Sequence, residues 1–359
     1  MKVFHCTHCR HLVFFENTRC VSCNHVLAFV PELMSMAAMV PLTDGRWRIA
    51  GRGSGRRRYH LCRNYSAENV CNWALAAEEP QALCESCRLT QVIPNLGVEG
   101  NRDAWFKLEA AKRRLLYSLK QLHCPIESRA QDPEGGLAYR FLSDADADSP
   151  VLTGHGDGIV TVNIAEADDA ERERRRLQLG EPYRTLLGHF RHEVGHYYWD
   201  RLVRRGERLE SFRQLFGDER ADYGAALKRH YEQGGPAADW QQYYVSAYAA
   251  SHPWEDWAES WAHYLHMSDM LETAAECGLS LTPRNRDEPV LLRPRSGTGE
   301  PFERLIASWF PLTYVLNNLN RSMGLADAYP FVLSTPAIAK LRFVHDIIAG
   351  APAAAAATA

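Results

Sequence analysis

The sequence predicts an α+β protein in which an all-β or irregular, cysteine-rich N-terminal region precedes a mostly helical domain with a small sheet. Two observations carry this prediction. Eight of the ten cysteines lie within the first 87 residues. Further along, the string His192-Glu193-Val194-Gly195-His196 lies inside a stretch with the apolar periodicity of one long helix. We expect the two parts to span 1–95 and 96–350, followed by a disordered Ala-rich tail at 351–359.

Length and charge restrict the class of protein. A chain of 359 residues is long enough for two or three domains with a large core. Its formal charge of −3 predicts no general attraction to nucleic acid or to acidic membranes. The start of the chain lacks the apolar stretch of a signal peptide, and no apolar run approaches membrane-spanning length. We therefore expect a cytoplasmic protein with no membrane partner.

The first four cysteines form two Cys-x-x-Cys pairs separated by ten residues. Between them, Phe14-Phe15 and Glu16-Asn17 indicate a short strand and a turn. Thiolates at this spacing hold one tetrahedral zinc ion, as in a zinc ribbon. Such a site has no open coordination position, so its role is structural. The predicted ligands are Cys6, Cys9, Cys20 and Cys23.

A second quartet follows, in which only the last two cysteines have the Cys-x-x-Cys spacing. We expect a second structural zinc site here, although the two quartets could also interleave their pairs around the two ions. Two further cysteines stand alone and are expected to be buried apolar thiols. The predicted ligands are Cys62, Cys71, Cys84 and Cys87, and the two remaining cysteines are Cys124 and Cys277.

Between the quartets, residues 45–58 are rich in Arg and Gly. An arginine-rich loop beside a zinc ribbon can hold phosphates, which is the basis for considering nucleic acid as a partner. We favour the alternative that this segment is a solvated connector.

The elements between the cysteines and the His-Glu string follow from local patterns. Apolar residues at helical spacing over 105–122 predict a helix that joins the two parts. The β-branched segment 158–164 follows a turn-rich stretch and predicts a strand. The mixed charges of 171–176 predict an exposed helix face, and the amphipathic stretch 338–348 closes the C-terminal part.

The His-Glu-x-x-His helix carries the chemistry. Positions i and i+4 share a helix face, so His192 and His196 can bind one metal ion while Glu193 faces the same pocket. Pro182 is placed where a first helical turn would begin. A metzincin would have its third ligand six residues beyond His196, but Leu202 occupies that position, so this class is excluded.

The third ligand must therefore come from further along the chain. The segment 251–254 has the residues of a helix start, and the helix that it begins carries Glu255 and Glu259 on one face. Tyr248, Glu255 and Glu259, at spacings of seven and four, resemble the second-helix motif of gluzincin metallopeptidases of the lethal-factor type. More broadly, the chain is similar to a bacterial family of zinc-binding metallopeptidases with an N-terminal zinc ribbon. That similarity includes the runs 188–199, Cys71-Asn72-Trp73 and 320–324.

The resemblance implies a zincin-like metallopeptidase domain in which Glu255 is the third zinc ligand. It further implies that Glu259 supports the ligands and that Tyr248 donates a hydrogen bond to the oxyanion. Asp256 is the nearest competitor of Glu255, and the segment from Asp218 to Asp222 could instead supply an aspartate ligand. Two more histidines lie a turn from the ligands and are expected to be buried or supporting groups, His189 and His263.

We therefore expect a zinc metallopeptidase or amide hydrolase in which zinc lowers the pKa of water from about 15.7 to about 7 and Glu193 is the general base. In gluzincins the strand before the active helix is a sheet edge that pairs with extended substrate, which suggests peptide binding along 158–164. The alternatives are a catalytically silent zinc-ribbon adaptor that binds nucleic acid or protein, and a hydrolase of a non-protein amide.

Three zinc-type clusters predict about three zinc ions per chain, one catalytic and two structural. Elemental analysis of protein purified without chelators tests this number. A value of one or none would contradict either the ribbon or the catalytic assignment.

Overall fold

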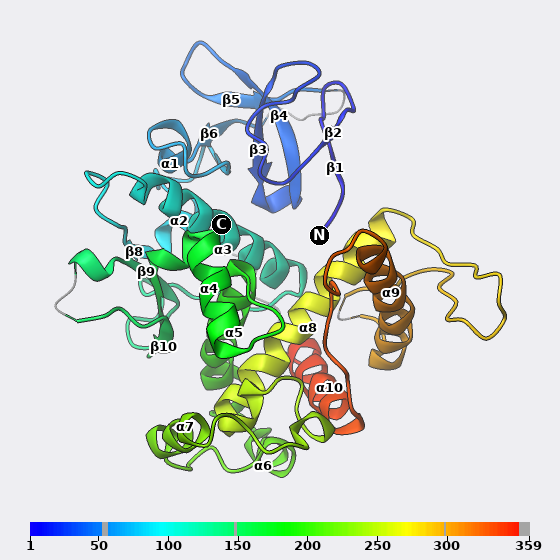
Figure 1. Cartoon of the computed structure of the whole chain (residues 1–359). Coiled ribbons are helices and arrows are strands. Elements are labelled where there is room, and N and C mark those ends of the chain that lie inside the picture. Colours follow the sequence, from blue (N-terminus) through cyan, green and yellow to red (C-terminus); the bar gives the residue numbers. More distant parts are fainter. Residues whose placement is uncertain (52–56, 147–148, 298, 352–359) are drawn as a thin grey trace.

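The structure is a computed structural model that describes residues 1–51, 57–146, 149–297 and 299–351. It has the predicted α+β architecture: N-terminal strands around the two cysteine quartets, then a mostly helical part with a small sheet. In Figure 1 the N-terminal strands lie at one end of the molecule, and the long helix α8 crosses the helical part. Apart from Ala351, the expected Ala-rich tail at 351–359 lies outside the described residues.

The N-terminal region is built from a two-stranded ribbon and a five-stranded antiparallel sheet. The expected strand between the first Cys-x-x-Cys pairs is shifted slightly, because Leu12 and Val13 form it and a turn begins at Phe14. Part of the expected connector 45–58 is also a strand, whereas its residues 52–56 lie outside the described part. The strands are β1 (Phe4–His5), β2 (Leu12–Val13), β3 (Val26–Val30), β4 (Ser35–Pro41), β5 (Trp47–Ile49), β6 (Tyr59–Leu61) and β7 (Ala74–Ala76), and the short helices are η1 (Pro31–Leu33), α1 (Arg63–Ser66) and α2 (Glu85–Arg88).

A four-stranded sheet with the order β10-β11-β9-β8 supports the helical part. Its strands are β8 (Thr90–Val92), β9 (Ala138–Leu142), β10 (Gly154–Gly156) and β11 (Ile159–Asn163). The predicted strand 158–164 is present as β11, but its expected position at the sheet edge is wrong. It pairs in parallel with β9 and in antiparallel with β10, so β10 is the edge strand. The turn-rich stretch before β11 forms this extra strand because Asp157 and Gly158 both have positive φ, the geometry of a tight type I′ hairpin.

The helices pack on this sheet and on one another. Lys112 of α3 lies over the rings of Tyr139 and Phe141 of β9, and Phe190 of the His-Glu helix α5 packs against the same two rings. α5 begins at Leu186 rather than near Pro182, because the Thr185 side chain caps it by accepting from the Gly188 N–H at 3.0 Å. The elements are α3 (Asn101–Gln121), η2 (Asp144–Asp146), η3 (Ile164–Ala167), α4 (Asp169–Leu179), α5 (Leu186–Tyr198), η4 (Trp199–Val203), α6 (Leu209–Phe216), α7 (Tyr223–Glu232), η5 (Trp240–Gln242), η6 (Tyr248–Ser251), α8 (Pro253–Glu276), α9 (Phe302–Ser322) and α10 (Thr335–Ala349).

The two parts share one core through α3. The ring of Tyr117 lies 5.7 to 6.2 Å from the rings of Phe4, Phe15 and Phe29, all of which belong to the N-terminal region. Next to this cluster, the buried Arg113 donates to the carbonyl oxygen of Val70 at 2.7 Å. None of the described helices combines the length and the apolar character needed to cross a membrane.

α5 and α8 cross at close range at Gly195. A Cβ added to Gly195 would lie 3.0 Å from the Cα of Ala258 and 3.3 Å from the Cβ of Trp261. The Gly195 carbonyl oxygen accepts a hydrogen bond from the Trp257 indole at 2.8 Å. The missing side chain therefore lets α8 bring its glutamates up to the two histidines of α5.

We expect Gly195→Ala to lower the free energy of unfolding by about 1–3 kcal/mol, because the added methyl group meets helix backbone that cannot move aside. At an uncrowded helical position the same change stabilises by about 0.5–1 kcal/mol. Gly224 in α7 offers such a control, since a Cβ there would meet only the Asp222 side chain among the described residues, at 3.6 Å. Denaturant unfolding followed by tryptophan fluorescence gives both values. A Gly195→Ala protein as stable as Gly224→Ala would refute the packing argument.

Candidate active site

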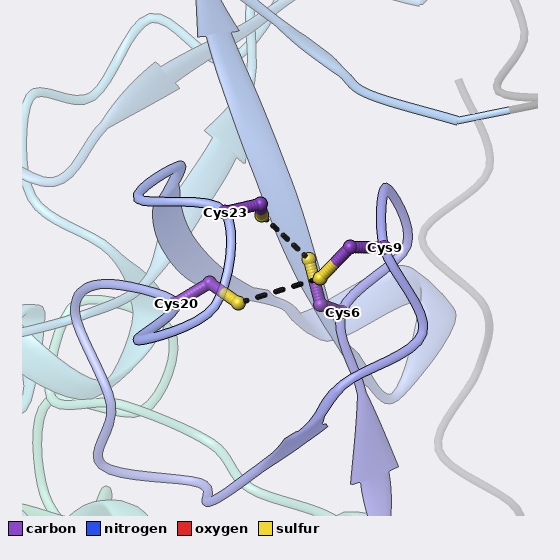
Figure 2. A group of neighbouring side chains, drawn as sticks. All are labelled: Cys6, Cys9, Cys20 and Cys23. Carbon is purple, nitrogen blue, oxygen red and sulfur yellow. Dashed lines mark hydrogen bonds between the residues drawn. The ribbon is translucent and has the colours of Figure 1, made fainter.

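The two cysteine quartets close in sequence order, without interleaving. In Figure 2 the side chains of Cys6 and Cys9 face those of Cys20 and Cys23. The Sγ atoms of Cys6 and Cys23 are 3.6 Å apart, as are those of Cys9 and Cys20. The backbone N–H of His11 lowers the pKa of the Cys9 thiol to about 6, whereas burial raises the pKa values of Cys6 and Cys23.

The second quartet is buried throughout. Cys62, Cys71, Cys84 and Cys87 offer sulfur atoms that all lie within 4.8 Å of one another. The backbone N–H groups of Trp73 and Cys84 point at the sulfurs of Cys71 and Cys62, at 3.4 and 3.3 Å. Both quartets have the closed four-thiolate composition of structural zinc sites. Of the two single cysteines, Cys124 is buried as expected, whereas Cys277 is exposed.

The third cluster joins α5 and α8. His192, His196 and Glu255 each offer one ligand atom, and these atoms lie within 4.8 Å of one another. The Oε2 atom of Glu255 is 3.0 Å from His192 Nε2 and 3.6 Å from His196 Nε2. Among the described residues, this buried oxygen nevertheless has no hydrogen-bond partner. Two imidazole nitrogens and an unpartnered carboxylate oxygen that converge in this way fit a zinc ion, which prefers such ligands.

Two neighbouring side chains orient these groups. The Oε1 atom of Glu259 lies 2.7 Å from His192 Nδ1, so the other nitrogen of that ring is left to face Glu255. Tyr223, at the start of α7, donates its hydroxyl to Glu255 Oε1 at 2.7 Å, which leaves only Oε2 free. The sequence pattern did not single out Tyr223, because its hydrogen bond joins helices that are 32 residues apart in the chain.

The electrostatics of the cluster favour a positive charge at its centre. Burial lowers the pKa of His192, but the carboxylates of Glu255 and Glu259 outweigh burial and hold this pKa well above its usual value. Burial also opposes ionisation of Glu255, yet His192 and His196 hold its pKa well below the usual range. The site thus keeps a buried carboxylate ionised beside two imidazoles.

Glu193 and Tyr248 both lie at this cluster. Burial raises the pKa of Glu193, while the nearby His192 and His196 oppose the shift. The Tyr248 ring, on η6, has its centroid 5.9 Å from that of His192. Burial raises the pKa of Tyr248, so its phenol stays protonated and can donate a hydrogen bond.

The competing acidic residues have other partners. Asp256 is buried and pairs with Lys340 of α10 at 2.5 Å, and burial raises its pKa to about 7. Asp218 forms an ion pair with Arg220 at 2.8 Å. Asp222 caps α7 by accepting from the backbone N–H of Ala225 at 2.8 Å.

The two extra histidines also have partners outside the cluster. His189 lies 3.3 Å from the buried carboxylate of Glu166, and burial lowers its pKa to about 4. His263 is 2.8 Å from the hydroxyl of Tyr329 through its Nδ1 atom. A third histidine that the sequence pattern did not indicate lies at the site: His155 of the edge strand β10 stacks on His196, with centroids 6.1 Å apart and an interplanar angle of 18°.

Comparison with known proteins assigns both parts of the chain. A family model described as "putative zinc-binding metallo-peptidase" matches residues 101–347, and a zinc-ribbon domain model matches residues 3–98. Proteins of Mycobacterium tuberculosis and Mycobacterium bovis are 43% identical over 349 residues, which cover 97% of this chain and 95% of theirs. Their names describe them only as uncharacterised proteins. No solved structure matches the chain significantly.

We expect Glu255→Ala to lower the zinc affinity of the third site by more than the roughly 10- to 100-fold typical of losing a supporting group, because a direct ligand is removed. Glu259→Ala should weaken binding less, and Tyr248→Phe should leave it unchanged. Competitive zinc titration, corrected for the ions held by cysteine, measures all three.

Asp218→Ala is the control for these variants, since Asp218 is an exposed acidic residue that pairs with Arg220 on the surface. Wild-type affinity in Glu255→Ala, together with a loss in Asp256→Ala, Asp218→Ala or Asp222→Ala, would refute the ligand set.

Proposed function

The chain belongs to the family of zinc-binding metallopeptidases with an N-terminal zinc ribbon, and we propose that it is an active gluzincin-type peptidase. The observation that carries the proposal is the Oε2 atom of Glu255, which is buried, unpartnered and directed at two histidine Nε2 atoms. Zinc binding alone would not require Glu193. Its carboxylate beside His192 and His196 therefore favours an enzyme over a silent zinc-binding adaptor.

In this proposal His192, His196 and Glu255 hold the catalytic zinc ion, and the two cysteine quartets hold the structural ions, about three in all. When bound, the catalytic ion polarises the scissile carbonyl and lowers the pKa of a water molecule towards about 7. Glu193 accepts the proton of that water and returns it to the leaving amine. The raised pKa of Glu193 favours the first step, because a carboxylate that is too acidic would be too weak a base to accept the proton of the water.

Three other residues orient the metal ligands or stabilise the oxyanion. Glu259 holds His192 in the tautomer that carries its proton on Nδ1, so that Nε2 is free to bind metal. The protonated phenol of Tyr248 donates to the oxyanion as the carbonyl becomes tetrahedral. Tyr223 holds Glu255 through Oε1 and so favours binding through a single oxygen.

We propose a peptide or protein substrate that pairs with the sheet edge, now located at β10 rather than at 158–164. Gly156 and Ile159 flank the two-residue turn and form a hydrogen-bonded pair in such hairpins. The next pair, His155 and Val160, is then not hydrogen-bonded, so the N–H and C=O of His155 face outward. An extended substrate backbone can bind these groups with little dependence on its side chains.

The same proposal retains the boundaries 1–95 and 96–350 for the ribbon region and the peptidase domain. It also retains a cytoplasmic location, since two four-thiolate sites persist best in a reducing compartment. Hydrolysis of a non-protein amide uses the same groups, so the substrate class is decided by experiment.

Glu193→Gln should lower peptide hydrolysis by about 10²- to 10⁴-fold while all three zinc ions remain, because only the proton acceptor is lost. Cleavage of a peptide library, followed by mass spectrometry, compares this variant with the wild type. Cys9→Ser is the contrasting variant: it should lower thermal stability through loss of a structural ion.

Loss of the third zinc ion in Glu193→Gln would contradict the general-base role. Equal cleavage by Glu193→Gln and the wild type would exclude catalysis at this site. If neither protein cleaves peptides while zinc is fully bound, the adaptor and the non-protein amidase replace the peptidase.

A further inference from the structure

The two histidines of α5 are supported differently. His192 is held at Nδ1 by the Glu259 carboxylate at 2.7 Å. For His196, no hydrogen bond to either ring nitrogen is found within the part of the chain that the structure describes. Instead, its ring packs edge-on against His192, with centroids 5.0 Å apart, and lies nearly parallel to the ring of His155 of β10, with centroids 6.1 Å apart.

His155 is itself held rigidly. The backbone N–H of Gly158 donates to His155 Nε2 at 3.1 Å, across the hairpin turn. The turn is anchored in its place, because the Gly158 carbonyl oxygen accepts from Ala138 N–H at 2.9 Å. The turn also requires glycine at position 158. The φ of Gly158 is +81°, and a Cβ at this position would lie 2.5 Å from the carbonyl oxygen of Gly136.

The hydrogen bond also determines the form of the His155 ring. A nitrogen that accepts from a backbone N–H carries no proton, so His155 is neutral and bears its single proton on Nδ1. A neutral ring can lie face-on against a metal-binding imidazole without placing a second positive charge beside the ion. The stack with His196 therefore supports a metal ligand rather than opposing it.

We propose that His155 is a positioning residue for the metal centre: its ring, fixed by the β10–β11 hairpin, restricts His196 to the rotamer that directs Nε2 at Glu255. His155 orients the ring of His196 through stacking, just as Glu259 orients the ring of His192 through a hydrogen bond. Because the backbone of His155 also lies at the edge where we propose that substrate binds, one residue joins the substrate-binding edge to a metal ligand. This inference rests on the metal site of the proposed function.

The test separates stacking from hydrogen bonding. His155→Ala removes the ring, whereas His155→Phe keeps a flat ring and loses both nitrogens. We expect His155→Ala to lower the zinc affinity of the third site by about 10-fold, the lower end of what a supporting group contributes. His155→Phe should stay within about threefold of the wild type. Leu152→Ala, at an exposed position two residues before β10, is the control and should bind zinc as the wild type does.

A second readout needs no turnover. With zinc left in the cysteine sites and cobalt in the third site, the visible d–d bands report ligand geometry. We expect these bands to shift in His155→Ala and to be retained in His155→Phe and Leu152→Ala. Thermal unfolding of the three variants detects any general loss of folding, and His155→Phe remains informative if His155→Ala folds poorly.

Three outcomes would overturn the inference. Unchanged zinc affinity and spectrum in His155→Ala would show that the stack does not position His196. An equal loss in His155→Phe and His155→Ala would assign the effect to a nitrogen atom of the ring. Absence of a third metal ion from the wild type would remove this inference and the proposed function together, whereas a bound ion without peptidase activity would remove only the latter.

Discussion

The candidate active site depends on the crossing of α5 and α8 at Gly195. With no side chain at that position, the backbone of α8 approaches to a distance that a methyl group would already obstruct. The Trp257 indole bonds to the Gly195 carbonyl and so fixes the rotation of α8 about its own axis. That rotation directs Glu255 and Glu259 at His192. Asp256, which follows Glu255, points instead towards Lys340. A single close contact thus decides which of the acidic residues of α8 face the candidate metal centre.

The N-terminal region and the helical part contain different kinds of candidate metal site. The cysteine quartets are closed and can stabilise only the fold, whereas the cluster on α5 and α8 has one carboxylate and two imidazoles and would keep a coordination position open. The two types are connected through α3. Tyr117 fills the aromatic core of the ribbon region and Arg113 bonds to the segment between Cys62 and Cys71. Folding of the ribbon region around its ions therefore supports the helix on which the peptidase part packs.

The edge strand β10 borders the candidate site beside His196. β10 is only three residues long, yet its central residue stacks on His196 and its backbone faces outward. A short edge strand is a weak template for unwanted pairing with other chains, while it still offers one N–H and one C=O to an extended peptide. If substrate binds as we propose, its position and the orientation of His196 depend on the same hairpin, whose turn requires Gly158.

The sequence by itself determined the features that local spacing encodes. Cys-x-x-Cys spacing grouped the cysteines, helical periodicity placed His192, Glu193 and His196 on one face, and the helix start at Pro253 placed Glu255 and Glu259. Only the tertiary structure decided what depends on contacts between distant segments. The sequential closure of the two quartets, the bond from Tyr223 to Glu255, the stack of His155 on His196 and the position of β10 at the edge all join residues that no periodic pattern relates. Periodicity reports which face of an element is buried, but the partner of that face is chosen by packing.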